Sequence, residues 1–143
     1  MTDLTAYKET IERGGFPAIG PKLGMIQMNT TVVGLTSAND RSDCFAIPAG
    51  TLIISAGFEV VTPSTNGVTA SLGLETDGAG SATSLMGETA TNSTAGTNAS
   101  GGYAKANVMV STADTLVLEI SGDPGAAGEV RVWAIVADMK DMK

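Results

Sequence analysis

Short runs of β-branched and apolar residues, separated by Gly, Pro, Asn and Asp, dominate the chain from Met25 onward. The runs cover residues 25–36, 44–47, a longer stretch from 51, 68–75, 103–111, 115–121 and 129–138. Runs this closely spaced favour antiparallel sheets over a parallel α/β sheet, which needs helices between its strands. We therefore expect an all-β fold, a single jelly-roll-like β-sandwich. The 143 residues provide one such domain and no second core.

The pattern within two of the runs predicts which side chains face the core. In residues 115–121, Leu116, Leu118 and Ile120 fall on one face of a strand, and Val117 and Glu119 fall on the other. This two-residue period is typical of a half-buried strand. The last run is apolar on both faces, so we expect it to be a central strand or one covered on both sides.

Residues 1–24 differ from the rest of the chain and predict an N-terminal arm. Thr2 can cap a short helix, which the Gly14–Gly15 pair would end. A narrow apolar stripe at helical spacing is formed by Leu4, Tyr7 and Ile11. The following stretch up to Gly24 is rich in Gly and Pro, as linkers are. We expect the arm to fold back onto its own domain, residues 25–143, or to reach a neighbouring subunit.

Residues 78–102 fit neither a strand nor a helix, because they are small and polar apart from Leu85 and Met86. A long segment without secondary structure inside a compact domain is uncommon and is often functional. We predict a surface excursion held at Leu85 and Met86 and ordered by a neighbouring chain, with a simple flexible loop as the alternative.

The charge of the chain argues against a nucleic-acid partner. The formal net charge is −7, and the basic residues are spread along the sequence. Without a basic cluster there is nothing to follow a phosphate backbone, so we expect no nucleic-acid partner.

The sequence also indicates no membrane segment. No apolar run is long enough to span a bilayer, and the charged N-terminus is unlike a signal peptide. The single cysteine, Cys44, indicates folding in a reducing compartment.

The sequence offers no catalytic residues, metal ligands or cofactor motif. Histidine is absent, which removes the usual general base and most zinc sites. Cys44 lies in an expected strand and is interpreted as a small core residue. The acidic residues lie on outward strand positions or in turns, and no calcium-loop motif is present. The Gly78-Ala79-Gly80 sequence lacks the remainder of a nucleotide-binding motif. We expect no enzyme and no cofactor.

Aromatic and large apolar residues are scarce, so those that fall outside clear core positions are candidates for contacts between subunits. Trp133 is either a core aromatic or an anchor at such a contact, where Trp is enriched. The candidate intersubunit contacts are Leu4, Tyr7, Ile11, Phe16, Leu85, Met86 and Trp133.

Three segments carry a resemblance to a known group of proteins. They are FAIPAGTLIISAGFEVVTP, which has an Ile-Pro-Ala-Gly corner before a long strand, ASLGLETDGAG, and the closing segment GEVRVWAIVADM. Over about residues 42–138 the chain resembles small jelly-roll-like structural proteins of tailed bacteriophages, the capsid decoration or auxiliary head proteins.

The resemblance implies a role in the virion. The chain would be a decoration or cement protein on the capsid surface, bound to the major capsid protein and to its own copies, with a trimer favoured. A tail or fibre component is the nearest variant. A surface-displayed carbohydrate-binding module is a further alternative, for which the sequence shows no aromatic platform.

Overall fold

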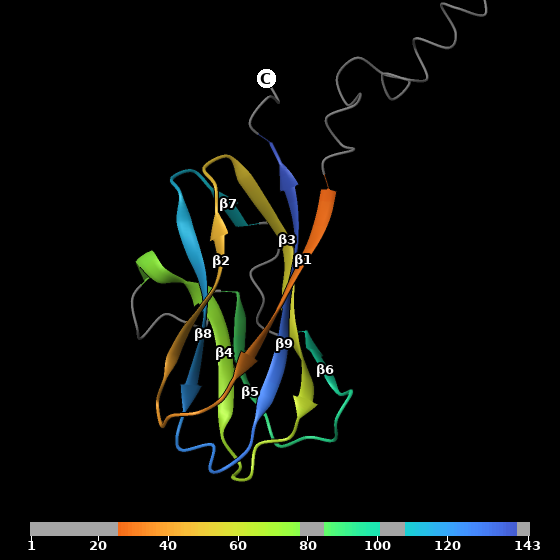
Figure 1. Ribbon diagram of the computed structural model, residues 1–143. Coiled ribbons are helices and arrows are strands. Elements are labelled where there is room, and N and C mark those ends of the chain that lie inside the picture. The colour runs from red at the N-terminus through yellow and green to blue at the C-terminus, as the bar shows by residue number, and fades with distance from the viewer. Residues whose placement is uncertain (1–25, 78–84, 101–107, 140–143) are drawn as a thin grey trace, which may run out of the picture.

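The structure, a computed structural model, describes residues 26–77, 85–100 and 108–139. The expected arm of residues 1–24, with its short helix, lies outside the described residues. The described chain is built almost entirely of strands (Figure 1). They are β1 (Ile26–Gly34), β2 (Arg41–Ile47), β3 (Thr51–Thr62), β4 (Thr69–Leu74), β5 (Met86–Ala90), β6 (Asn98–Ser100), β7 (Val108–Val110), β8 (Asp114–Ser121) and β9 (Glu129–Asp138), with a 3-10 turn, η2, at Glu75–Asp77.

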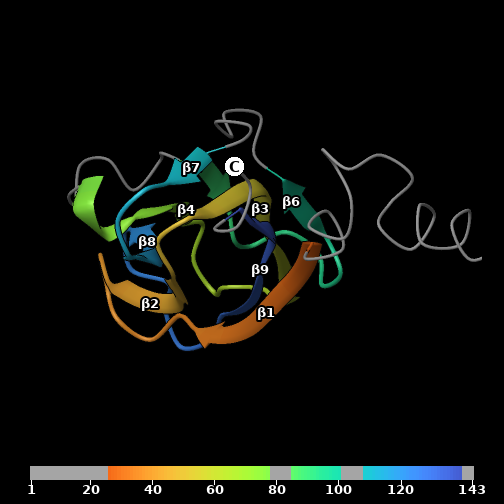
Figure 2. The same ribbon diagram turned by 90° about the horizontal axis from the view of Figure 1, so that it is seen from above.

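The strands form two antiparallel sheets that pack face to face (Figure 2). Sheet A has the order β1-β9-β3-β6, and β7 also pairs with β3. Sheet B has the order β2-β8-β4-β5. These sheets confirm the all-β sandwich that the sequence predicts. The last strand, β9, is central in sheet A, as its apolar character on both faces indicated.

The first half of the chain pairs with the second half in reverse order. Strand β1 pairs with β9, β2 with β8, β3 with β7 and β6, and β4 with β5, all antiparallel. The chain therefore forms one long antiparallel ribbon that is rolled into two layers.

The core lies between the two sheets, and the two inner faces differ in shape. Sheet A contributes mainly Val and other β-branched or small residues: Val33, Ile53, Ala56, Val60, Val110, Val130, Val132, Ala134 and Val136, together with Phe58. Sheet B contributes mainly longer side chains: Ile47, Ala70, Leu72, Leu74, Met86, Leu116, Leu118 and Ile120. Leu116, Leu118 and Ile120 are thus buried on one face, as the alternation predicted. Large side chains opposite small ones allow the two layers to interdigitate.

The interpretation of residues 78–102 as one surface excursion is wrong for much of its length. Residues 86–90 form β5, residues 98–100 form β6, and Thr91 between them is fully buried. The hydroxyl groups of Thr91 and Ser64 lie 2.7 Å apart, and Thr91 also donates to the carbonyl of Val68. Backbone hydrogen bonds to neighbouring strands and the buried hydroxyl pair of Thr91 and Ser64 hold this part in place. Its Gly, Ala and Asn residues are uncommon in strands.

Two glycines have similar backbone angles but different surroundings, so a comparison of the two tests how closely the chain packs around one of them. Gly125 and Gly96 have φ of +83° and +88°. A Cβ at Gly125 would lie 2.8 Å from the Cβ of Thr65, whereas a Cβ at Gly96 would meet no atom within 4 Å.

We expect Gly96→Ala to lower the free energy of unfolding by about 1–2 kcal/mol, because an L-residue is strained in the left-handed region. Gly125→Ala should cost about 1–3 kcal/mol more, because the added methyl group also overlaps a neighbour. Urea denaturation of the two variants measures the difference. Equal losses would contradict the close approach of Gly125 and Thr65.

Candidate interaction surface

The outer face of sheet A carries large apolar side chains that the core does not use. Residues that alternate with the buried ones point outward, and the strand register aligns them in rows across the sheet. One row contains Ile26, Ala137, Leu52 and Met109, the next contains Met28, Ile135 and Ser55, and a third contains Thr30, Trp133 and Gly57. We call this set of outward residues on β1, β9, β3 and β7 the sheet A face.

The sheet A face is partly exposed and has few charges, namely Glu129 and the pair of Arg131 with Glu59. Ile26, Met28, Val32 and Met109 are 51%, 58%, 49% and 52% exposed, and they are the large hydrophobic residues most exposed in the described part of the chain. The fourth row contains Arg131 and Glu59, whose side chains form an ion pair at 2.7 Å and so neutralise one another. Exposed apolar residues that gather on one face typically mark an interaction site.

The outer face of sheet B has the opposite character. Its outward positions include Arg41, Asp43, Thr115 and Glu119, and the register places Arg41 beside Glu119 and Asp43 beside Val117. The Arg41 guanidinium donates to the backbone carbonyl of Glu75 at 3.3 Å. The face is more polar than that of sheet A, although Val117 and Ser71 within it are buried, so the two sides of the sandwich are not equivalent.

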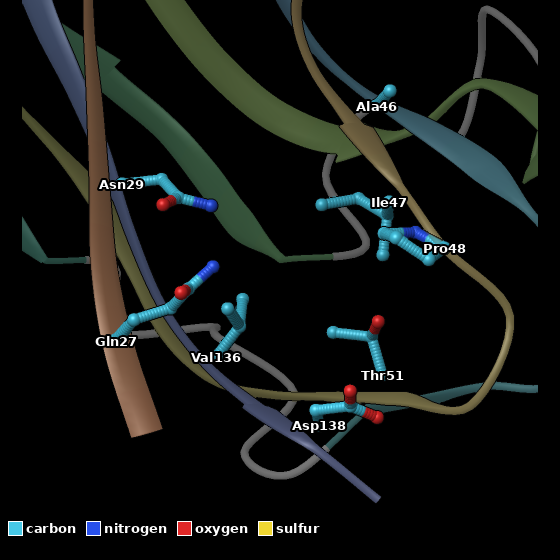
Figure 3. Close-up of a pocket in the computed structure, with 8 residues that line it drawn as sticks. All are labelled: Gln27, Asn29, Ala46, Ile47, Pro48, Thr51, Val136 and Asp138. Carbon is cyan, nitrogen blue, oxygen red and sulfur yellow. The ribbon is translucent and has the colours of Figure 1, made fainter. Parts of the chain in front are cut away.

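Strand β1 shows the asymmetry most clearly, because its polarity is inverted over its first half. Gln27 and Asn29 point toward the inside of the sandwich, while Ile26 and Met28 point outward. Figure 3 shows both amide side chains directed into a cleft of about 240 Å³, opposite Ile47. The cleft is open, so water can satisfy the amides. A strand with one face on the core and the other in water would have apolar residues inside and polar residues outside, the reverse of this arrangement.

Trp133 lies on the sheet A face and is half-buried, so its interpretation as a core residue is wrong. Its indole Nε1 donates to Oδ1 of Asn98 at 3.0 Å. Because β3 lies between β9 and β6, the indole spans β3 at Gly57, the residue directly opposite Trp133. The register shifts in β3 fall at Ile53/Ser55 and Val60/Thr62, on either side of Gly57.

The structure separates the other predicted contact residues from this surface. Leu85 and Met86 are 1% and 0% exposed and belong to the protein's own core, so their side chains are closed to a second chain in this structure. Leu4, Tyr7, Ile11 and Phe16 lie outside the described residues. Sequence reasoning missed Ile26, Met28, Val32 and Met109, although the alternation in β1 and the two methionines carried a signal.

The groups that might have carried chemistry have structural roles. Cys44 packs against the core, and burial raises the pKa of its thiol to about 12. Partial burial would raise the pKa of Asp114, but hydrogen bonds from Thr76 and Thr115 outweigh it and lower this pKa below its ordinary value. Within residues 26–77, 85–100 and 108–139, no group of three or more acidic or cysteine side chains could hold a metal ion, and no helix is long and apolar enough to cross a membrane.

Comparisons with known proteins find similarity in structure only. No protein-family model matches the sequence, and no curated protein matches it significantly. A chain in the acidic stable capsid structure of Helicobacter pylori bacteriophage KHP30 is similar, with a TM-score of 0.63 and 12% identity, over 79% of this chain and 87% of that chain. A chain in the cyanophage Pam1 capsid asymmetric unit gives a TM-score of 0.56 and 17% identity, over 78% and 84%.

At these identities the likeness shows a shared fold. Both structures are capsids of bacterial viruses, the class of particle to which the sequence resemblance pointed.

The environment of Cys44 makes a prediction that can be tested directly. A thiol whose pKa is about 12 has almost no thiolate at about pH 8, whereas the thiol of the unfolded chain is partly ionised there. We expect the native protein to react with a disulfide reagent at least about a hundredfold more slowly than the protein in denaturant. Reaction at equal rates would contradict the burial of this side chain.

Proposed function

We propose that the protein is a structural component of a bacteriophage virion, a capsid decoration or cement protein that binds the major capsid shell and its own copies. The observation that carries the proposal is the sheet A face, an exposed apolar and nearly neutral surface on a chain of net charge −7. The fold is shared with chains of two phage capsid structures, and this likeness supports a capsid as the particle to which the protein belongs.

The sheet A face can supply the affinity that assembly requires. Fully burying a large apolar side chain contributes about 1.5–3 kcal/mol, and Ile26, Met28, Val32 and Met109 each still expose about half of their surface. Each contact of this kind is modest, but many copies on one shell gain avidity from acting together. The acidic residues elsewhere keep the free chain soluble until it meets its partner.

The proposed role needs no catalysis, and it agrees with the absence of histidine from the sequence. The location would be the capsid surface, reached after folding in the host cytoplasm. The resemblance favours clusters of three copies. A trimer requires two different patches on each copy to meet head to tail, whereas a two-fold pair uses one patch twice.

Met109→Lys tests the sheet A face in assembly, because it places a charge at the β7 end of an apolar row, with β9 and β3 between it and β1. We expect the folded variant to bind at least about tenfold more weakly to shells of its own phage that lack this protein, since the buried lysine would have to be desolvated. Ala90→Lys, an exposed residue on the outer face of sheet B, is the matched control and should bind as the unmodified chain does. Co-sedimentation of the purified proteins with the shells measures both.

If both variants bind the shells equally weakly, or if both bind as the unmodified chain does, the contact through sheet A is contradicted. Absence of the chain from shells but presence in purified tails would favour the tail or fibre variant. Retention of a monomeric protein on a glycan array would favour a carbohydrate-binding module.

A further inference from the structure

Strand β1 is an unprotected sheet edge. It is nine residues long and lies at the end of sheet A, paired on one side with β9 in an unbroken register from Ile26 to Gly34. In the described part of the chain no strand pairs with its other side. Figure 2 shows β1 at the margin of the molecule. Its sequence IQMNTTVVG contains no charge and no proline. An uncharged edge of this length is a template for pairing with another strand.

The remaining edges of the described sheets carry the features that prevent such pairing. Strand β2 has the charged residues Arg41 and Asp43, has a bulge after Asp43, and is followed by Pro48. Strand β5 is five residues long, includes Glu88 and pairs with an irregular register. Strands β6 and β7 are only three residues each. Charges, bulges and short length protect edges in natural sheets, so β1 stands out as the edge left open.

We propose that β1 pairs edge to edge with β1 of a second copy of this chain, antiparallel and about a two-fold axis at Thr30. This inference rests on the proposed function only in that assembly brings copies together. It names the surface through which two copies meet.

The sequence of β1 suits pairing with itself. With the two-fold axis at Thr30, Met28 lies opposite Val32 of the second copy, and Ile26 lies opposite Gly34. On the other side of the sheet, Asn29 lies opposite Thr31. Met28 and Val32 therefore meet as apolar neighbours on the sheet A face, where Thr30 meets Thr30 at the axis. On the inner side the polar pair of Asn29 and Thr31 is followed by Gln27 opposite Val33. Cross-strand pairs are the unit that stabilises a sheet.

Charge also favours a second copy as the partner. At net charge −7, two copies repel one another over most of their surface. Strand β1 has no charge, and the neighbouring Arg131 is paired with Glu59, so only Glu129, opposite Gly34 at the end of the strand, adds unpaired negative charge along this edge. A two-fold contact also extends the sheet A face of one copy into that of the next. It yields a pair in place of the trimer that the resemblance favours.

A cysteine at the two-fold position tests the register. In Thr30→Cys the two introduced thiols would lie directly opposite one another, at a Cα separation of about 4.5–5.5 Å that a disulfide can bridge. We expect the full-length variant to form a disulfide-linked dimer on mild oxidation about a hundredfold faster than Ala90→Cys, since pairing raises the effective thiol concentration to millimolar. The native Cys44 is half-buried, and its raised pKa leaves almost no thiolate to compete.

Two further variants fix the geometry. Met28→Cys and Val32→Cys should each dimerise slowly alone and rapidly when mixed, because each lies opposite the other across the axis. Rapid linking of Met28→Cys with itself would indicate another register and overturn the proposal. A full-length Thr30→Cys variant that stays monomeric and forms no linked dimer would also overturn the proposal. That result is expected if residues 1–25 of the same chain cover the edge.

The two proposals fail in different ways. A chain found on the capsid whose Thr30→Cys variant does not link in solution or on particles keeps its proposed function and loses the β1 pairing. A chain that links rapidly through Thr30→Cys and is absent from virions keeps the pairing and loses the proposed function.

Discussion

The hydrogen-bonded register of β9 between β1 and β3 is the constraint on which the surface of this protein depends. It turns Val130, Val132, Ala134 and Val136 toward the leucine-rich layer of sheet B. The same alternation turns the intervening residues outward, Trp133 among them. A slip of one residue would exchange the two faces and place the ion-paired Arg131 in the core, so burial of the valines fixes the register. The apolar outer face is therefore a consequence of the same pairing that builds the core.

Sequence alone predicted the features that depend on local pattern. The alternation in Leu116, Leu118 and Ile120 and the apolar final run were sufficient for the sandwich, the inner face of β8 and the central place of β9. Residues 86–100 escaped prediction because their order comes from backbone bonds to distant strands and from the buried Thr91 hydroxyl, which leave no local signal. For Trp133 the sequence left two interpretations, core residue or contact residue, because a strand apolar on both sides does not reveal which side faces the core.

The functional surface was only partly accessible to sequence reasoning. Its residues come from β1, β3, β7 and β9, which are far apart in the chain and meet only through the sheet order. The inverted polarity of β1, with Gln27 inside and Met28 outside, becomes visible only once the inner face is known. A protein whose two sheet faces differ this much in charge and polarity is suited to lie against other protein chains on one side and against water on the other.

A high-resolution cryo-EM map of the phage particle that carries this chain tests the central claim most directly. The account predicts density for the sandwich on the capsid, with the sheet A face and its Met28 and Met109 buried against neighbouring chains and the outer face of sheet B turned to solvent. Density that shows the reverse orientation, with Met28 and Met109 fully solvated and Arg41 and Glu119 at the contact, would contradict it.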